Sequence, residues 1–171
     1  MTLLFQYGSN TSQSRLNSQD RLMGDATPLG LFETTREHRL EFSVPSKTNN
    51  CAAANLAAAP GRRIRGVVYE VPDHVMSKAT AGPRRSMDEI EGSRYHREAI
   101  TLLDPAGLLG GRPVLTYLVT SPKAGLLTSL AYVTHIISGL RSFDAPAEYI
   151  QYVKDCAVRN NPGLAAGLDT L

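Results

Sequence analysis

Apolar residues are spaced differently in the two parts of this chain, and the spacing predicts strands first and helices later. A short apolar run, Leu3-Leu4-Phe5, opens the chain, and Leu40 and Phe42 alternate with polar neighbours inside "PLGLFETTREHRLEFSV". The segment "RRIRGVVYEV" combines alternation with the highest β-branched content, which is typical of a central strand. We therefore predict a buried first strand, two short strands within residues 28–44 and a central strand over residues 62–71.

Small residues and glycines mark the connections between strands. The segment "NNCAAANLAAAPG" (residues 49–61) has no helical stripe and ends in Pro-Gly, so it is interpreted as an extended approach to a turn. Two further strands are predicted in "RYHREAITLLD" and "RPVLTYLVTS", which are joined by the glycine-rich "PAGLLGG". Three short helical stretches are predicted over residues 11–23, over residues 72–82 with Pro72 as first residue, and over residues 86–92, where Gly92 ends a capped turn.

The last third of the chain has helical periodicity. Apolar residues recur at i, i+4, i+7, i+11 and i+14, as one face of an amphipathic helix requires: Leu126, Leu130, Val133, Ile137 and Leu140. This stripe could be core or part of a dimer face. A second helix begins near Pro146, directs Ile150, Val153 and Ala157 towards the core, and ends at "RNNPG". Strands followed by helices predict an α+β fold rather than a regular βαβ alternation.

Length and composition narrow the class of protein. A chain of 171 residues with 42% hydrophobic and 20% charged residues fits one globular domain over residues 1–171. A formal net charge of +2 with scattered arginine groups does not favour a nucleic-acid or membrane-surface partner. The chain has two cysteines and four histidines without ligand spacing, and it shows no leader and no long apolar stretch. These features predict a soluble cytoplasmic protein without a metal site.

Two short segments could carry chemistry, because the common nucleotide-binding and serine-hydrolase motifs are absent. Tyr7-Gly8-Ser9-Asn10 follows the first strand, and we expect a tight loop in which Gly and Asn tolerate positive φ. Its free backbone N–H groups could bind an anion or a polarised carbonyl. The second segment is the acidic turn Asp88-Glu89-Ile90-Glu91-Gly92. Taken separately, an ordinary solvated turn and a solvated Glu91 would explain both.

The order of these segments resembles the γ-glutamylcyclotransferase family over nearly the whole chain, from about residue 3 to about residue 165. The resemblance rests on the following positions: Tyr7-Gly8-Ser9-Asn10, Asn55 before Pro60-Gly61, Gly66-Val67-Val68-Tyr69, Asp88 to Gly92, Tyr95, Arg97, Tyr132, Ile136, Gly139, Pro146, Tyr149 and Ile150. It implies a mixed, partly closed β-barrel flanked by helices, with the active site at the barrel mouth.

The resemblance also implies roles for particular residues. Backbone amides of Gly8, Ser9 and Asn10 would hold the γ-glutamyl group, and Glu91 would be the acid/base. The reaction would be attack of the substrate's α-amine on its own γ-carbonyl, which releases 5-oxoproline and an amine or amino acid without a cofactor. Tyr7 could form the pocket wall. Tyr95 and Tyr132 could orient the glutamyl carboxylate or amine, although core packing with a satisfied hydroxyl explains each tyrosine equally well.

Several alternatives stay open from sequence. The turn before Glu91 has Met87 where family members commonly carry leucine, and "AGPRRS", with Arg84 and Arg85, looks inserted and could bear on the leaving-group side. Within the fold, the protein could remove a γ-glutamyl protecting group from a specialised amine in a biosynthetic pathway. It could also be a non-catalytic small-molecule binding module, and either a monomer or a homodimer.

Overall fold

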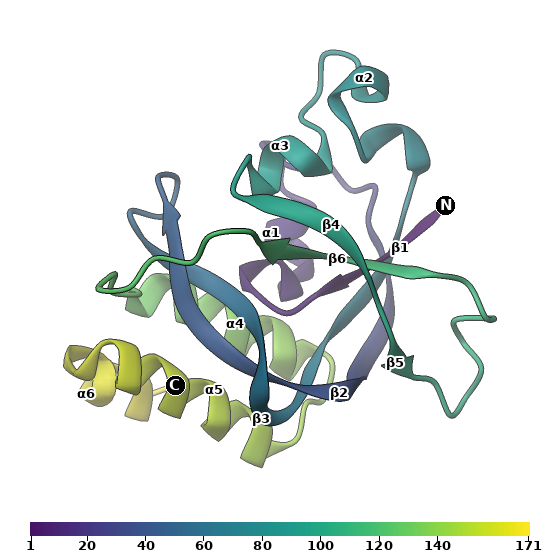
Figure 1. The fold of residues 1–171 in the computed structure, drawn as a ribbon. Coiled ribbons are helices and arrows are strands. Elements are labelled where there is room, and N and C mark those ends of the chain that lie inside the picture. Colours follow the sequence, from purple (N-terminus) through teal and green to yellow (C-terminus); the bar gives the residue numbers. More distant parts are fainter.

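The computed structural model describes residues 1–171 and is built around one curled, mixed sheet (Figure 1). Its strands are β1 (Thr2–Gln6), β2 (Thr27–Ser46), β3 (Cys51–Val71), β4 (Tyr95–Ile100), β5 (Leu102–Leu103) and β6 (Val114–Val119). They lie in the order β4-β6-β1-β3-β2-β5, in which only β1 and β6 are parallel. The helices are η1 (Ser9–Thr11), α1 (Gln13–Leu16), η2 (Asp73–Val75), α2 (Lys78–Ala81), α3 (Met87–Glu91), α4 (Leu130–Ser142), α5 (Ala147–Asn160), η3 (Pro162–Leu164) and α6 (Ala165–Asp169).

The two ends of the sheet are connected through a single residue. β4 and β5 occupy opposite ends of the strand order, yet only Thr101 separates them in the chain. β4 pairs with β6 and β5 pairs with β2, and the backbone N–H of Thr35 donates to the carbonyl of Thr101 at 3.0 Å. The sheet must therefore curl until its edges meet, which gives the partly closed barrel that the family resemblance implies, within the α+β order that the sequence pattern predicts. The single strand predicted over residues 94–104 is thus two short strands with different partners.

The β2–β3 hairpin is longer than the sequence indicates. The two strands predicted within residues 28–44 are one strand of 20 residues, and residues 49–61 do not approach a turn but begin β3, which has 21 residues. The register explains the difference, because His38 faces Arg62 while Arg39 faces Ala57, so residues 58–61 form an irregularity that holds Pro60. Proline costs no ladder hydrogen bond at such a place, and the strand continues through it.

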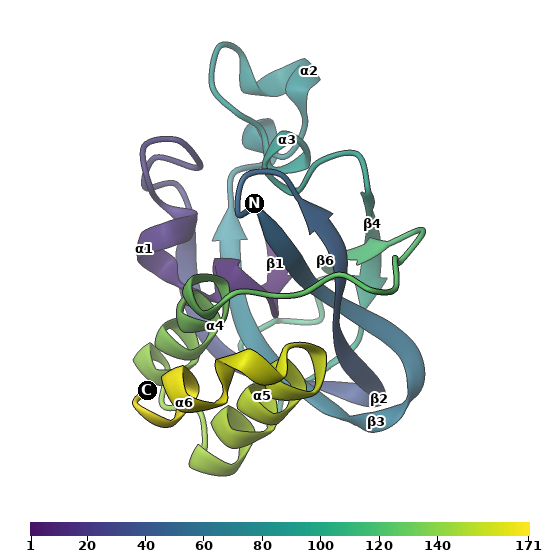
Figure 2. The same cartoon turned by 90° about the vertical axis from the view of Figure 1, so that its left-hand side faces the viewer.

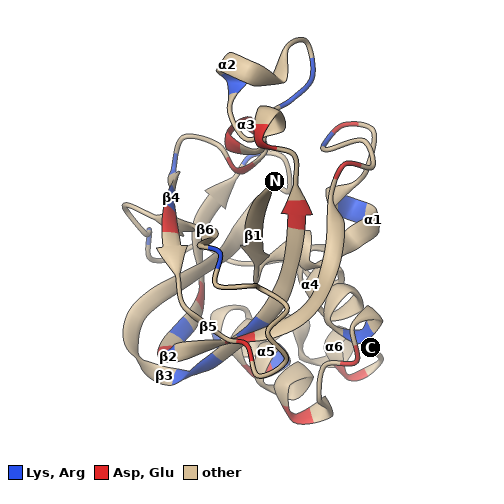
Figure 3. Ribbon diagram, turned by 90° about the vertical axis from the view of Figure 1, so that its right-hand side faces the viewer, with Lys and Arg blue, Asp and Glu red and all other residues tan.

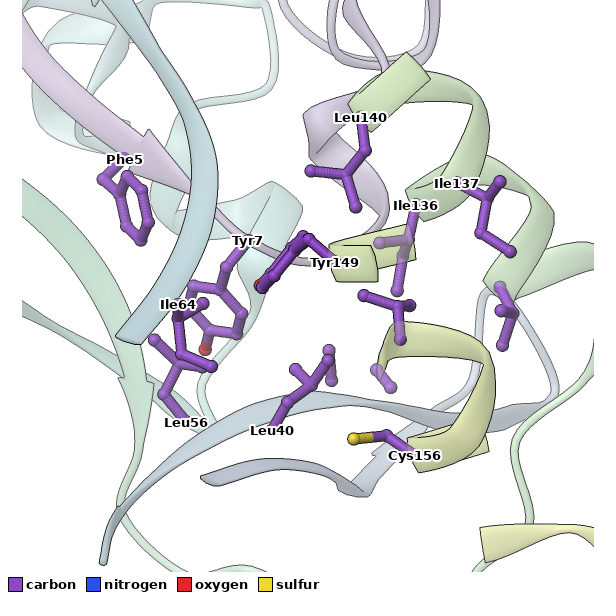
Figure 4. Packing of buried hydrophobic residues seen from close by; sticks show 14 of the residues in the cluster. Phe5, Tyr7, Leu40, Leu56, Ile64, Ile136, Ile137, Leu140, Tyr149 and Cys156 are labelled. Atoms are coloured by element: carbon purple, nitrogen blue, oxygen red, sulfur yellow. The ribbon is translucent and has the colours of Figure 1, made fainter. Parts of the chain in front are cut away.

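β1 and residues 66–69 of the central strand β3 are buried on both faces, as the apolar run Leu3-Leu4-Phe5 predicts for β1, whereas residues 57–63 of β3 are exposed or half-buried. Leu3, Phe5 and Val68 join a large cluster with the C-terminal helices, whereas Leu4 and Val67 join a second cluster on the other face. Successive side chains of a strand point to opposite faces, so each half of the run supplies a different core. Figure 4 shows the large cluster, in which Ile136, Ile137 and Leu140 of α4 and Cys156 of α5 lie near residues of the strands.

The C-terminal helices gather on one side of the β2–β3 hairpin, and α2 and α3 lie at the opposite end of the molecule (Figure 2). The predicted helix from Leu126 starts later, at Leu130, because the Ser129 hydroxyl accepts from the N–H of Tyr132 and caps it there. Leu126 is therefore outside the helix. The second helix follows the prediction closely, with Ile150, Val153 and Ala157 buried. No helix in the protein combines the length and the apolar character needed to cross a membrane.

Two of the predicted short helices were wrong in extent. Ser12 caps a helix as expected, but α1 ends at Leu16, and residues 17–24 continue as turns and a bend. Residues 72–82 form two separate pieces, η2 and α2, and Pro72 precedes the first piece as its cap. These segments lack the length that makes a helix self-sustaining, so tertiary contacts decided their shape.

Candidate active site

The loop after β1 needs a glycine for space and not for backbone conformation. Gly8 has φ −95°, so the expected positive φ was wrong. A Cβ at Gly8 would instead lie 3.2 Å from the hydroxyl of Tyr132 and 3.5 Å from the Cβ of Ala54. The loop is therefore packed tightly against α4 and β3.

Helix α4 supports this loop from behind. A Cβ at Gly139 would lie 2.3 Å from the carbonyl carbon of Thr11, so the helix and the loop backbone touch directly. Thr11 is anchored further by its hydroxyl, which donates to the carbonyl of Ile136, and by its own carbonyl, which accepts from Tyr69 at 2.9 Å. The N–H groups of Gly8 and Asn10 have no acceptor in the chain. Two rigidly held donors are consequently left for a bound group.

Helix α3 is the capped turn that the sequence predicts. Ser86 and Glu89 form a capping box, and Gly92 ends the helix at φ +85°, a conformation that favours glycine. The Asp88 carboxylate accepts from the hydroxyl of Tyr117 at 2.8 Å and lies 3.2 Å from Nε of Arg97. These contacts join α3 to β6 and β4, which fixes the direction of Glu91.

Glu91 is half-buried and points towards the loop after β1. Its Oε1 accepts from Nδ2 of Asn10 at 2.9 Å and from Nε2 of Gln6 at 3.4 Å. Asn10 in turn accepts from Nη1 of Arg21 at 2.9 Å. Burial raises the pKa of Glu91 above its ordinary value, although the hydrogen bond from Asn10, the charge of Arg21 and the hydrogen bond from Gln6 each lower it. A raised pKa suits a carboxyl group that exchanges protons near neutrality.

A small cavity of about 30 Å3 brings together the residues to which the family resemblance gives a role in the site: Tyr7, Gly8, Ser9, Asn10, Glu91, Tyr95 and Tyr132. A wider cavity of about 340 Å3 adjoins it and shares Ser9, Asn10, Glu91, Tyr95 and Tyr132. The two form the deep end and the outer part of one concavity. The outer part has the size of a small-molecule site, and Glu91 lies where the two meet.

The three tyrosine hydroxyls are bonded to the backbone. Tyr7 donates to the carbonyl of Tyr117 at 2.7 Å, and Tyr95 donates to the carbonyl of Ala54 at 2.8 Å. The hydroxyl of Tyr132 accepts from the N–H of Ala54 at 3.0 Å. Burial raises the pKa of each tyrosine, so all three are neutral at physiological pH. Tyr95 and Tyr132 hold β3 in place, Tyr7 is fixed to β6, and all three line the cavity.

Two residues near Glu91, Gln6 and Arg21, belong to the site although no sequence motif identifies them. Gln6 is the last residue of β1, and only its position before Tyr7 could have drawn attention to it. Arg21 lies in a segment predicted to be helical, carries no recognisable signal, and is only 7% exposed. Its proximity to Glu91 depends on the turns that replace the predicted helix. No group of three or more His, Cys, Asp or Glu side chains is arranged to hold a metal ion.

Comparison with known proteins places this geometry in a known fold. No protein-family model matches the chain, and no curated protein matches it. A solved γ-glutamyl cyclotransferase superposes with a TM-score of 0.71 at 19% identity, covering 90% of this chain and 86% of that one. The chain has the γ-glutamyl cyclotransferase fold.

Two further structures share this fold. An uncharacterized protein from Homo sapiens matches with a TM-score of 0.71, 19% identity, and coverage of 90% of this chain and 86% of its own. YkqA from Bacillus subtilis matches with a TM-score of 0.68 and 19% identity, covering 91% of this chain. The match spans 54% of YkqA, which is therefore a considerably longer protein. At 19% identity the similarity concerns the fold alone.

Proposed function

We propose that this protein is a γ-glutamyl cyclotransferase that converts a small γ-glutamyl compound into 5-oxoproline and a free amine or amino acid. The observation that carries the proposal is the position of the Glu91 carboxylate, which lies in one concavity with the free N–H groups of Gly8 and Asn10. A proton acceptor and a pair of oxyanion donors are the two parts that this cyclisation requires.

The proposed reaction is intramolecular. The α-amine of the glutamyl group attacks its own γ-carbonyl, a bond forms between that nitrogen and the γ-carbon, and the bond from the γ-carbon to the leaving nitrogen breaks. Nucleophile and electrophile belong to one molecule, so the protein has to fold the substrate and move protons. No nucleophilic side chain and no cofactor enter this scheme.

Glu91 would carry the protons. The substrate amine is mostly an ammonium at neutral pH and cannot attack, so the Glu91 carboxylate accepts a proton from it and later donates one to the leaving nitrogen. Burial raises the pKa of Glu91, which brings the carboxyl group closer to the pH at which it must both accept and donate. Asn10 and Gln6 hold Oε1 by hydrogen bonds, which leaves Oε2 for the substrate.

The loop after β1 would stabilise the tetrahedral intermediate. Its oxyanion would accept hydrogen bonds from the N–H groups of Gly8 and Asn10, which are already held in place by α4 and β3. Loss of one such donor typically costs about 3–4 kcal/mol in the reaction barrier. The tyrosine wall would exclude water from the deep end and shape the space for the folded glutamyl group.

The test is release of 5-oxoproline from γ-glutamyl amino acids, γ-glutamyl amines and glutathione. We expect turnover by the wild-type protein and its loss in Glu91→Gln. The control is Glu98→Gln, which makes the same chemical change at an exposed position of β4 and should retain wild-type rates.

The panel also separates the alternatives. A strong preference for one γ-glutamyl amine would indicate removal of a protecting group in a biosynthetic pathway. Binding of 5-oxoproline without turnover of any panel member would contradict the proposed enzyme and indicate a binding module. Near wild-type turnover in Glu91→Gln would contradict the acid/base role.

A further inference from the structure

The outer part of the concavity is lined by cations from three separate segments. Lys47 comes from the turn between β2 and β3, Arg85 precedes α3, and Arg94 follows α3. All three are exposed and none forms an ion pair with a carboxylate. Arg21 adds a fourth, buried cation deeper in the cavity. In Figure 3 the basic loop between α2 and α3 lies directly beside the acidic residues of α3.

The acidic residues at the cavity do not neutralise these cations. Glu89 is already occupied, because its Oε2 accepts from the Ser86 N–H at 2.9 Å and its Oε1 lies 3.5 Å from Nζ of Lys78. Asp20 does not line the cavity and accepts from the hydroxyl of Ser18 at 2.6 Å, although the charges of Arg21 and Arg85 contribute to its lowered pKa. Glu91 is the one remaining acid that lines the cavity. The wall therefore carries an excess of positive charge, which attracts an anionic ligand.

The fold holds the guanidinium of Arg85 and anchors the turn that carries Lys47. Arg85 donates from Nη2 to the carbonyl of Glu89 at 2.8 Å and from Nη1 to the carbonyl of Asp20 at 3.3 Å. These carbonyl groups orient the guanidinium, which forms no ion pair with a carboxylate. The turn that carries Lys47 is fixed to α1, because Arg15 donates to Oδ1 of Asn49 at 2.6 Å. Because the Arg85 guanidinium is already oriented, less conformational entropy is lost when it binds an anion.

The number of cations exceeds what an ordinary γ-glutamyl amino acid needs. Such a substrate has a glutamyl carboxylate next to the amine that Glu91 serves, and one carboxylate on the leaving amino acid. Arg21, which bonds Asn10 beside Glu91, can meet the first. Three cations then remain at the rim for a single carboxylate.

We propose that the leaving group carries a second negative charge in addition to its α-carboxylate, as in a dicarboxylic or phosphorylated amino acid, and that Lys47, Arg85 and Arg94 bind it. This inference rests on the proposed cyclotransferase function. It assigns a substrate class to the outer part of the same site, where the basic insert at residues 81–86 contributes Arg85.

The experiment compares substrates that differ in charge and hardly in shape. γ-Glutamyl-glutamate is paired with γ-glutamyl-glutamine, and γ-glutamyl-O-phosphoserine with γ-glutamyl-serine, so that the two pairs distinguish a carboxylate from a phosphate. We expect kcat/KM to favour the charged member by about tenfold, mostly through KM, and the preference to shrink with added salt. The double variant Lys47→Gln, Arg94→Gln should reduce the preference to about twofold, because two exposed ion pairs are lost.

A control variant separates a local site from net charge. Arg36→Gln combined with Lys123→Gln removes the same formal charge from exposed positions that do not line this cavity, and it should keep the wild-type preference. Equal kcat/KM values within both pairs, with turnover intact, would overturn the proposed anion site and leave the cyclotransferase standing. An equal loss of preference in the control would also overturn it. If no γ-glutamyl compound is cyclised, the proposed function itself fails and this inference falls with it.

Discussion

Asn10 donates a hydrogen bond from Nδ2 to Oε1 of Glu91 at 2.9 Å, which connects the loop after β1 to helix α3 across 81 residues of sequence. The same amide accepts from Arg21. Asn10 therefore transmits the orienting effect of a buried cation to the carboxylate without a direct ion pair. A direct pair with Arg21 would favour the charged form of Glu91 strongly and lower its pKa, whereas the intervening amide leaves the raised pKa that acid/base chemistry requires.

Removing this amide should move the pH dependence of activity. In Asn10→Ala, Glu91 loses a hydrogen bond that lowers its pKa, so the acid limb of the kcat/KM profile is expected to shift to higher pH, and kcat should fall because the carboxylate is less well oriented. Gln13→Ala, an amide truncation at an exposed position of α1, is the control. An unchanged or lower apparent pKa in Asn10→Ala would show that Asn10 does not tune Glu91.

Glu91 should also reduce stability at alkaline pH. Because its pKa is raised in the folded protein, the folded state binds the proton more tightly than the unfolded chain, and stability is lost as pH rises from the unfolded pKa through the folded pKa. The neutral Glu91→Gln variant lacks this loss. Its Tm should exceed that of the wild type at about pH 8 and match it below about pH 4, where both side chains are neutral. A lower Tm of the variant at pH 8 would contradict the assignment.

The contact between α4 and the loop after β1 should be sensitive to one methyl group. Gly139→Ala would place a Cβ against the backbone of Thr11, so we expect a loss of about 1–3 kcal/mol in stability and a larger loss in kcat, because the loop donors move. Gly167→Ala is a matched helical control, since its Cβ would meet only the flexible end of Leu130. Unchanged activity in Gly139→Ala would show that the loop position is not critical.

Gly8 and Tyr132 should show coupled effects. Gly8→Ala brings a Cβ to 3.2 Å from the Tyr132 hydroxyl, and Tyr132→Phe removes that hydroxyl but leaves the Ala54 N–H unpaired, at a cost of about 1–3 kcal/mol. In a double-mutant cycle the combined variant should lose less stability and less activity than the sum of the single variants. Strict additivity would mean that the two residues do not compete for the same space.

Local patterns in the sequence predict those elements whose causes are local. The capped turn over residues 86–92 follows from Ser86, Glu89 and Gly92, and the central strand and the two C-terminal helices follow from hydrophobic periodicity. The sequence also predicts the loop after β1, but Gly8 is needed there for its lack of a side chain and not for the expected positive φ.

The sequence by itself thus determined an α+β order and the central strand, because periodicity and capping are properties of neighbouring residues. The order of its motifs along the chain, through the family resemblance, also selected a short list of residues that share one cavity. Tertiary structure alone decided the closure of the barrel at Thr101, the full length of the β2–β3 hairpin and the arrival of Gln6 and Arg21 beside Glu91. These features depend on pairing and burial between segments far apart in the chain. The raised pKa of Glu91 belongs with them, since it arises from burial that no local pattern encodes.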